Sequence, residues 1–455
     1  MLLSDSLSVV ATKLVRRLRE SGFVAYFAGG CVRDALLGKE PKDVDIATDA
    51  DPEQVQSLFP RTVAVGAKFG VLRVLEGSFE FEVATFRSDG VYLDGRRPVS
   101  VTFSSPEEDA KRRDFTINGM FYDPVEDKVV DFIGGKLDLE HRLIRAIGDP
   151  TARFSEDHLR LLRAVRFAAS LDFEIEKATW QAVRQNACQI KTVSAERIRD
   201  ELVKIFADPH RLRGLDLLDQ SGLLQVVLPE VTDLHGCEQP PQFHPEGDVY
   251  IHTRLMLSLL SPDASPELAF SVLLHDIGKP VTKSYDAVDQ RIRFNGHDQV
   301  GATMAEEVMT RLRFSNEQIA TVVEAIRNHM VFKDAPSMRP AKLRRFMGRE
   351  NFPLELELHR VDCLGSHGDL QTYELLTEKQ KAFENEPIIP PPLVTGHDLI
   401  ALGLAPGPRF GEILEAVQTA QLEGEVRDRS EALRLLRRLE PAIPADKIEE
   451  LSREV

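Results

Sequence analysis

The spacing of apolar residues changes at about residue 150. Before it, short β-rich runs predict strands in VAYFAGG (24–30), DVDIAT (43–48), FGVLRVLE (69–76) and FEFEVATFR (79–87). After it, apolar residues recur at i, i+3, i+4 and i+7, which predicts helices, for example over 155–171, 194–206 and 431–443. The pattern therefore predicts an α+β protein, with a mixed head followed by an all-helical body.

The length of the chain favours several domains over one. A chain of 455 residues exceeds what a single hydrophobic core organises, so two to four domains are expected. Proline-rich stretches at 238–247 and 386–396 are the strongest linker candidates. The expected boundaries are 1–150 for the head, 151–235 for a helical neck, 236–345 for a third domain with residues of interest up to 362, and 346–455 for a tail.

Composition excludes several classes of protein. Apolar residues make up 42% and charged residues 29%, which is typical of a folded globular chain. No apolar run approaches the length of a membrane span, and residues 1–22, with Asp5 in their apolar part, predict an amphipathic helix and not a signal peptide. We expect a cytoplasmic protein without a membrane partner; the oligomeric state is open.

Charge and cysteine content narrow the choice further. The net charge of −16 argues against a general nucleic-acid coat but allows an enzyme with a local basic surface. The four cysteines form no CxxC pair, which disfavours a disulfide framework and a zinc finger; they are Cys31, Cys188, Cys237 and Cys363.

Residues 26–48, YFAGGCVRDALLGKEPKDVDIAT, combine a glycine pair with two aspartates. A strand ends at Gly29-Gly30 and a helix follows, so backbone N–H groups and Arg33 are available to a phosphate. Asp43 and Asp45 are two residues apart on a predicted strand, and a period of two places both carboxylates on one face. Such a pair is a ligand set for Mg²⁺, and two metal ions can activate a hydroxyl and stabilise a leaving pyrophosphate.

This segment resembles the head of the class II tRNA nucleotidyltransferase and bacterial poly(A) polymerase family. The family motif GGxVRDxxLGxxxxDxDxxT has every fixed position here, from Gly29 to Thr48. The resemblance implies a polymerase-β-like head and two-metal nucleotidyl transfer, with Asp43 and Asp45 holding Mg²⁺ and Gly30 and Arg33 contacting the nucleotide.

The resemblance continues through the rest of the head. Glu82 matches a carboxylate position of the family, where it either assists the metal pair or packs. RRDFT (112–116) matches a second motif, which implies that Arg113 approaches the nucleotide and Asp114 accepts a hydrogen bond from a ribose hydroxyl. Gly134 and Gly135 fit the family's hinge between head and body, although a plain turn is the alternative.

The segment EDHLRLLRAVR (156–166) predicts a base-selecting pair. On a continuous helix, Asp157 and Arg160 face the same way, and an acceptor beside a donor can present a Watson–Crick-like edge to cytosine or adenine. EDxxR is the family's base-selecting motif. Arg163 and Arg166 continue the same side of the predicted helix and could hold the triphosphate. A surface salt bridge is the alternative. SAERIRDELVKIF (194–206) resembles a further family helix, for which support of the neck is the favoured role.

Three products are possible in this family: all of CCA, part of it, or poly(A). The segment with DGRRP (94–98) is full length, which disfavours C-only addition, and VGAKFGVLRV (65–74) is closer to the tRNA enzymes than to the poly(A) polymerases. Adenine-only enzymes share nearly all of these motifs. The expected function is CCA addition to tRNA from CTP and ATP; poly(A) polymerase or A addition is the alternative.

Residues 244–369 carry a second constellation, which resembles the HD phosphohydrolase domain. LLHDIGKP supplies His275 and Asp276, with His252 and Asp362 able to complete a mononuclear site for a divalent transition metal. His297 and His329 lie in the same stretch outside this predicted ligand set. The domain either hydrolyses phosphoesters or acts as a scaffold, and the rival reading of the whole chain is an HD phosphohydrolase with a non-catalytic nucleotide-binding head.

The tail is expected to contact RNA. Basic residues gather at 333–349 and in the last predicted helix, although solvated helix faces are the alternative; they are Lys333, Arg339, Lys342, Arg344, Arg345 and Arg349, followed by Arg434, Arg437 and Arg438. His397 and Asp398 form a second His-Asp pair, which lies outside the HD pattern and is expected to cap a helix.

Overall fold

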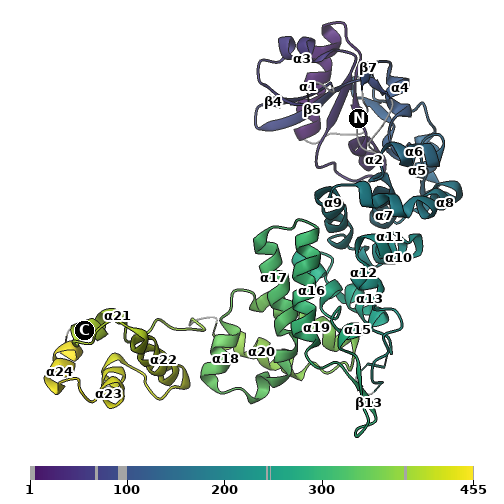
Figure 1. The fold of residues 1–455 in the computed structure, drawn as a ribbon. Coiled ribbons are helices and arrows are strands. Elements are labelled where there is room, and N and C mark those ends of the chain that lie inside the picture. The colour runs from purple at the N-terminus through teal and green to yellow at the C-terminus, as the bar shows by residue number, and fades with distance from the viewer. Residues whose placement is uncertain are drawn as a thin grey trace. The chain divides into compact units, whose positions relative to one another are not determined.

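The computed structural model describes residues 6–66, 70–90, 100–241, 244–245, 247–383 and 387–453 (Figure 1). They form two compact units, one of residues 1–233, 261–266 and 308–315, the other of 234–260, 267–307 and 316–455. The expected α+β class is confirmed. None of the helices in these ranges is long and apolar enough to cross a membrane. The finer division into four domains stays a prediction.

A mixed sheet forms the centre of the head. Its order is β3-β4-β5-β2-β1-β8-β9, in which β2 and β5 run parallel and the other neighbours antiparallel. The four predicted strands are confirmed as β1, β2, β4 and β5. The strands are β1 Ala25–Ala28, β2 Asp45–Thr48, β3 Thr62–Gly66, β4 Val71–Glu76, β5 Phe79–Thr85, β8 Phe121–Asp123 and β9 Lys128–Val130.

Short helices and a small ribbon complete the head. The predicted N-terminal amphipathic helix is α1, which buries Leu14, Val15 and Leu18 on one face. Gly135 packs closely, since a Cβ there would lie 2.3 Å from the Thr116 carbonyl oxygen; the hinge role stays a prediction. The elements are α1 Ser6–Glu20, α2 Gly30–Leu36, α3 Pro52–Leu58, β6 Arg87–Asp89, β7 Val101–Phe103, α4 Pro106–Lys111, η2 Thr116–Asn118 and α5 Gly135–Glu140.

The rest of the first unit is helical apart from a two-residue parallel pair. Gly214 lets α9 and α10 approach, since a Cβ there would lie 2.4 Å from Ile205 Cγ2. The elements are β10 Leu143–Ile144, α6 Pro150–Glu156, α7 Arg160–Leu171, β11 Glu174–Ile175, α8 Lys177–Asn186, η3 Ala187–Thr192, α9 Ala195–Phe206, α10 Arg211–Ser221, α11 Leu223–Val227 and α12 Pro229–Thr232.

The prediction of one helix through 155–171 is wrong. Helix α6 ends at Glu156, Asp157 has extended backbone with φ −144° and ψ 105°, and α7 begins at Arg160. The Asp157 carboxylate accepts a hydrogen bond from the Leu159 N–H at 3.1 Å. A short side-chain acceptor that bonds its own backbone offers an alternative to the helical ladder, which accounts for the break.

Helices dominate residues 249–382. Phe332, Phe346 and Phe352 form part of one buried cluster there. The elements are α13 Val249–Leu259, α14 Pro266–Leu274, α15 Lys279–Thr282, β12 Ser284–Asp286, β13 Arg291–Arg293, α16 His297–Arg311, α17 Asn316–Asn328, η4 His329–Ser337, α18 Pro340–Met347, α19 Phe352–Gly365 and α20 Gln371–Ala382.

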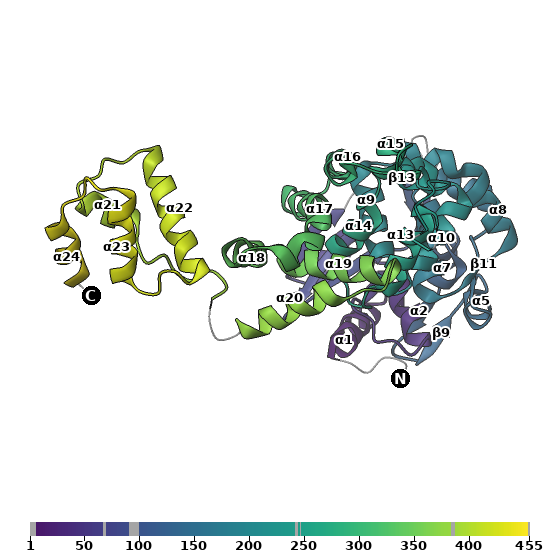
Figure 2. The same cartoon turned by 90° about the horizontal axis from the view of Figure 1, so that it is seen from below.

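The last four helices gather around their own apolar core, which includes Leu399, Val417 and Leu433 (Figure 2). The expected capping role of the His397-Asp398 pair is confirmed for Asp398, whose carboxylate accepts from the N–H and hydroxyl of Thr395 at the start of α21. RNA binding by the basic residues of this region stays a prediction. The helices are α21 Gly396–Ala401, α22 Pro408–Glu423, α23 Arg429–Leu439 and α24 Ala445–Arg453.

Candidate active site and metal centre

The glycine pair joins β1 to α2 in a left-handed turn. Gly29 has φ +78°, a conformation that favours glycine, and a Cβ at this position would lie 3.0 Å from Arg113 Nη1 at the end of a flexible side chain. Arg33, one turn into α2, donates to Asn118 Oδ1 at 2.6 Å and to Asp34 Oδ1 at 2.8 Å. The guanidinium groups of Arg33 and Arg113 therefore lie beside the backbone of Gly29 and Gly30, where Asn118, Asp34 and Asp109 hold them.

Three carboxylates lie close together at the start of β2. Strand β2 pairs in parallel with β5 through Ile46 and Val83, so the preceding residues, Asp45 and Glu82, are neighbours on one face. Desolvation in the cleft, with the nearby charges of Glu82 and Asp43, raises the pKa of Asp45 to about 6. Like charges held this close favour a bound cation, and carboxylate oxygens are ligands for Mg²⁺.

A cleft of about 520 Å³ in the first unit gathers the head and neck residues predicted from the sequence. Glu82 is the exception, since it does not line the cleft. Seven arginines line it, which suits a polyanionic ligand because guanidinium forks match phosphate oxygens. Its charged lining residues are Arg33, Asp43, Asp45, Arg112, Arg113, Asp114, Asp157, Arg160, Arg163, Arg166 and Arg197.

Asp114 is buried and fully engaged. Its Oδ2 accepts from Arg163 at 2.6–2.8 Å, and its Oδ1 accepts from the Phe115 N–H and the Asn118 amide. Burial alone would raise its pKa, but the Arg163 guanidinium and these hydrogen bonds lower it to about 2. Asp114 thus ties the head to helix α7 in addition to lining the cleft.

The Asp114→Asn variant should lose part of the acid sensitivity of folding. A carboxyl with pKa about 2 in the folded chain and about 4 in the unfolded one stabilises the fold above pH 4 by about 2 kcal/mol, and this contribution disappears as pH falls toward 2. Urea unfolding between pH 6 and 3 should therefore show a shallower loss of stability for Asp114→Asn. Asp172→Asn, which removes an exposed pair with Arg142, is the matched control and should follow the unchanged chain.

The two residues of the EDxxR motif line the same cleft but do not pair with each other. Asp157 is held by Arg197 of α9, whose Nη1 and Nη2 donate at 3.2 and 2.8 Å. Arg160 donates through Nη1 to the Arg153 carbonyl and the Glu156 carboxylate, and through Nη2 to the Arg112 carbonyl. The alternative of an i, i+3 salt bridge between Asp157 and Arg160 is therefore wrong.

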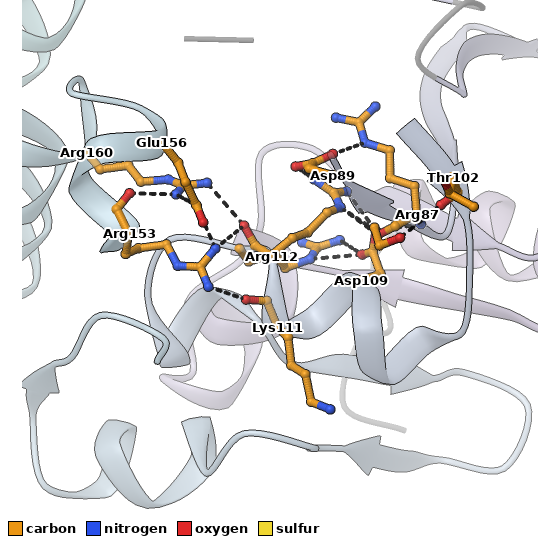
Figure 3. Close-up of polar contacts among 11 residues, drawn as sticks. Arg87, Asp89, Thr102, Asp109, Lys111, Arg112, Arg153, Glu156 and Arg160 are labelled. Atoms are coloured by element: carbon orange, nitrogen blue, oxygen red, sulfur yellow. Dashed lines mark hydrogen bonds and ion pairs between the residues drawn. The ribbon is translucent and has the colours of Figure 1, made fainter. Parts of the chain in front are cut away.

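Figure 3 shows how this network fixes the guanidinium of Arg160. Arg153 donates to the Lys111 and Arg112 carbonyl oxygens at 2.8 and 3.2 Å, so the turn between α6 and α7 is bonded to the head backbone. Arg160 uses three of its five N–H donors there. Within the described part of the chain, Nε–H and one Nη2 hydrogen have no partner, and these two donors remain for a ligand.

Sequence reasoning missed two residues of this site. Phe167 lies under three guanidinium groups, with the Cζ atoms of Arg33, Arg163 and Arg166 at 5.1, 5.2 and 4.1 Å from its ring centre. Arg197 was seen only as part of a supporting helix. The same helix supplies Glu201, which accepts from Arg166 at 2.6 Å. The sequence held one signal for the contacts of Arg197 and Glu201: the two residues are four apart, which places both side chains on one face of a helix.

The second unit brings the HD-pattern residues to one buried point. His252 on α13 lies 3.1 Å from Asp362 of α19, measured from Nε2 to Oδ1, and His275 Nε2 lies 3.0 Å from Asp276 Oδ2. The structure adds His297 and His329, both outside the predicted ligand set; Asp276, His297 and His329 present donor atoms within 4.8 Å of one another. Burial, with the neighbouring His275 and His297, lowers the pKa of His329 to about 4, so its imidazole is neutral and suited to a metal.

Gly278 explains how the backbone comes close to His297 at this centre. A Cβ on Gly278 would lie 2.3 Å from the His297 carbonyl oxygen and 2.7 Å from the Gly301 N. The backbone after Asp276 therefore crosses the first turn of α16 in direct contact. The glycine of HDIGK is required for this approach, which the sequence motif indicated without giving its reason.

Three family models match the chain. They are "Poly A polymerase head domain" over residues 25–145, "Probable RNA and SrmB- binding site of polymerase A" over 172–234, and "HD domain" over 249–364. The first two cover most of the unit that contains the arginine-lined cleft. The third covers the residues of the buried histidine centre.

Curated relatives and a solved structure agree with these matches. A CCA-adding enzyme of Streptococcus suis is 32% identical over 427 residues, 93% of this chain and 94% of the relative, and one of Lactobacillus helveticus is 41% identical over 239 residues, 52% of this chain and 59% of the relative. The crystal structure of the Bacillus stearothermophilus CCA-adding enzyme in complex with CTP is similar with a TM-score of 0.74 and 27% identity, over 96% of this chain and all of that one. This chain belongs to the family of CCA-adding enzymes.

Proposed function

We propose that this member of the CCA-adding enzymes completes the 3′ end of tRNA from CTP and ATP at the arginine-lined cleft of its first unit. The observation that carries the proposal is the shared cleft itself. The lining of this one cleft includes the Asp43 and Asp45 carboxylates from the head, Asp157 and Arg160 from the neck, and seven guanidinium groups from both. A metal-binding pair, a phosphate-binding surface and a base-reading pair are the three parts that templated nucleotidyl transfer needs.

Asp43 and Asp45 would hold Mg²⁺ in this proposal, which would supply positive charge to lower the pKa of the attacking hydroxyl and to neutralise the leaving pyrophosphate. The tRNA 3′-hydroxyl releases its proton to solvent, and its oxygen bonds to the α-phosphorus as the bond from that phosphorus to the bridging oxygen breaks and pyrophosphate leaves. Arg33 and Arg113, fixed beside Gly29, orient the triphosphate, and Arg163 and Arg166 extend that surface. Asp114 forms an ion pair with Arg163 and so positions that guanidinium group. Asp114 therefore acts on the ribose from its place in the lining of the cleft.

Base choice follows from the fixed donors and acceptors of the neck. Asp157 accepts from the exocyclic amino group of cytosine or adenine, and the remaining N–H groups of Arg160 donate to the adjacent ring nitrogen. Uracil and guanine would place a carbonyl against Asp157, which leaves polar groups unpaired. Residues 94–98, which bear on the change from C to A addition, lie outside the described residues.

We infer a cytoplasmic location, where tRNA and nucleoside triphosphates are available, and cell fractionation would test it.

The decisive experiment supplies tRNA transcripts that end before, within and after CCA with each labelled nucleotide in turn. The proposal expects CTP incorporation on the transcript lacking CCA, ATP incorporation only after two C residues, and no extension of the complete end. Extension of every transcript by many A residues would identify a poly(A) polymerase, and addition of A alone would identify an A-adding enzyme.

A second activity is favoured by the centre of the second unit. A cavity of about 550 Å³ joins Asp276, His297 and Asp362 to the basic side chains of Lys279, Arg291, Arg293 and Lys333. Buried imidazole and carboxylate groups suit a divalent transition metal, and the basic wall suits a phosphate ester. We infer hydrolysis of a phosphomonoester or cyclic phosphodiester, in which water oxygen bonds to phosphorus and the ester oxygen leaves with a proton.

The double variant His275→Ala, Asp276→Ala should lose this hydrolysis by at least about a thousandfold, since it removes two metal-facing groups, while CCA addition stays within about twofold. Release of phosphate from a 2′,3′-cyclic nucleotide and nucleotide incorporation are measured on the same preparation. If the variant hydrolyses as fast as the unchanged chain, the centre is a scaffold. If neither protein hydrolyses but the unchanged chain binds metal, the centre is structural.

A further inference from the structure

A buried carboxylate on α4 holds two consecutive arginines of the cleft. Asp109 Oδ1 accepts from Arg112 Nε at 2.9 Å and lies 2.7 Å from its Nη2, and Asp109 Oδ2 accepts from Arg113 Nε at 3.2 Å and from its Nη2 at 3.0 Å. Each carboxylate oxygen therefore takes the Nε–Nη2 edge of one guanidinium group. Charged hydrogen bonds of this kind fix the orientation of an arginine as well as its position.

The charge of Asp109 is balanced entirely from within the head. Burial alone would raise the pKa of this carboxyl, but the Arg113 and Arg112 guanidinium groups lower it, so Asp109 is ionised at neutral pH. A buried carboxylate is tolerated because it is paired in this way. Both arginines line the nucleotide cleft, whereas Asp109 is not part of its described lining. Asp109 therefore acts on the cleft through the arginines.

The first of these connections sets the face that Arg113 presents to the cleft. Asp109 takes Nε–H and one Nη2 hydrogen, and the Asn118 carbonyl oxygen accepts from Nη1 at 3.4 Å. In the described ranges of the chain, the other two of the five N–H donors have no partner. They belong to a residue that lines the cleft, so they are available to phosphate oxygens.

The second connection leads from Asp109 to the base-reading residue of the neck (Figure 3). The Arg112 guanidinium, besides its contact with Asp109, donates through Nε to the Arg87 carbonyl oxygen of β6 at 3.1 Å. The Arg112 backbone carbonyl accepts from Arg153 Nη1 at 3.2 Å and from Arg160 Nη2 at 3.1 Å. The anchored side chain of Arg112 thus fixes the backbone acceptor that holds Arg160.

We propose that Asp109 is a positioning residue for the incoming nucleotide, which holds Arg113 for the triphosphate and, through Arg112, holds Arg160 for the base. One carboxylate thereby sets the relative position of the groups that bind the two ends of a single nucleotide. Asp109 itself touches no substrate. This inference rests on the nucleotide addition proposed above for the cleft, and it assigns Asp109 to nucleotide affinity and base choice.

Asp109→Asn is the direct test, because it keeps the size of the side chain but removes the charge and replaces one acceptor by a donor. The KM for CTP should rise by about tenfold or more, the expected effect of losing charged hydrogen bonds, and UTP incorporation relative to CTP should rise by a similar factor. The kcat should stay within about threefold, since Asp109 binds no reacting group. Steady-state incorporation on a tRNA that lacks CCA measures all three quantities.

The matched control is the neighbouring carboxylate on the same helix. Glu108 is exposed and pairs with Lys111 at 3.0 Å, so Glu108→Gln should leave the KM and the base choice within about twofold. An unchanged KM and an unchanged base choice in Asp109→Asn would overturn the proposal. A fall in kcat at constant KM would also overturn it, because the carboxylate would then serve the chemical step.

Double variants distinguish positioning from a general loss of structure. If Asp109 acts through Arg113, Asp109→Asn should add less than about twofold to the raised KM of Arg113→Gln; likewise, it should add little to the UTP incorporation of Arg112→Gln. Independent, additive effects in both backgrounds would overturn the proposal. Arg112→Gln alone should relax base choice, a prediction that holds even if Asp109→Asn does not fold, and unchanged selectivity in this variant would break the connection to Arg160.

Equilibrium binding of CTP separates this inference from the proposed function. Isothermal titration of the full chain with CTP should give a Kd about tenfold higher for Asp109→Asn than for the unchanged chain. Equal Kd values would overturn the positioning role of Asp109, whatever the chain adds to tRNA. Weaker CTP binding by the variant, with no incorporation by the unchanged chain, would support the positioning role and overturn the proposed function alone.

Discussion

Asp45→Asn should reduce nucleotide addition by at least about a thousandfold, while tRNA binding is retained. The loss of a carboxylate from the metal pair removes several kcal/mol of stabilisation from the transition state, and about 4 kcal/mol corresponds to a thousandfold. Binding should persist because the remaining carboxylates repel phosphate less when one charge is gone. Asp43→Asn should behave in the same way. Single-turnover CTP incorporation and a filter-binding assay measure the two effects separately.

The control for this prediction lies on the neighbouring strand. Glu80 is two residues before Glu82 on β5 and makes an exposed ion pair with Arg73 at 3.2 Å, so Glu80→Gln should leave the rate within about twofold. The raised pKa of Asp45 adds a second test, because protons compete with the metal below about pH 6. Activity at limiting Mg²⁺ should fall below that pH and recover with excess Mg²⁺. Robust addition by Asp45→Asn would exclude this cleft as the metal site.

Patterns of period two and local motifs made most of the head predictable. The runs 43–46 and 79–83 alternate polar and apolar residues around Asp45 and Glu82, and the glycine pair marks the turn that only a residue free to adopt φ +78° can make. What local patterns could not show is the pairing of β2 with β5, which sets the two carboxylates side by side across about 37 residues of sequence. The family resemblance indicated a carboxylate at Glu82 before the strand register showed where that carboxylate lies.

The errors come from side-chain and backbone contacts that helical periodicity does not report, some local and some distant in the sequence. The helix through Asp157 is broken because that carboxylate bonds Leu159 and is held by Arg197, forty residues away. His297 enters the histidine centre because Gly278 lets the backbone after Asp276 contact the first turn of α16, which spacing along the chain does not reveal. Helical periodicity predicts the elements but not which polar residues meet between them.

Asp157→Ala should relax base choice by about ten- to a hundredfold and slow CTP addition less at saturating nucleotide. A mismatched base at this position leaves unpaired polar groups, each costing about 1–3 kcal/mol, and removing Asp157 removes that penalty for uracil and guanine. Arg160→Ala should relax selection similarly and also loosen the turn, since its guanidinium bonds the Arg112 and Arg153 carbonyls. The measurement is the ratio of CTP and ATP to UTP and GTP incorporation on a tRNA that lacks CCA.

Arg197 makes the prediction specific to this structure. Because its two nitrogens hold the Asp157 carboxylate, Arg197→Ala should leave the acceptor in place but free to rotate, and so give a smaller loss of selectivity than Asp157→Ala. His158→Ala, in the same turn with its ring bonded to Thr192, is the control and should keep the selectivity of the unchanged chain. If Asp157→Ala and Arg160→Ala both select bases as the unchanged chain does, the neck residues only brace the cleft and base choice must come from the head.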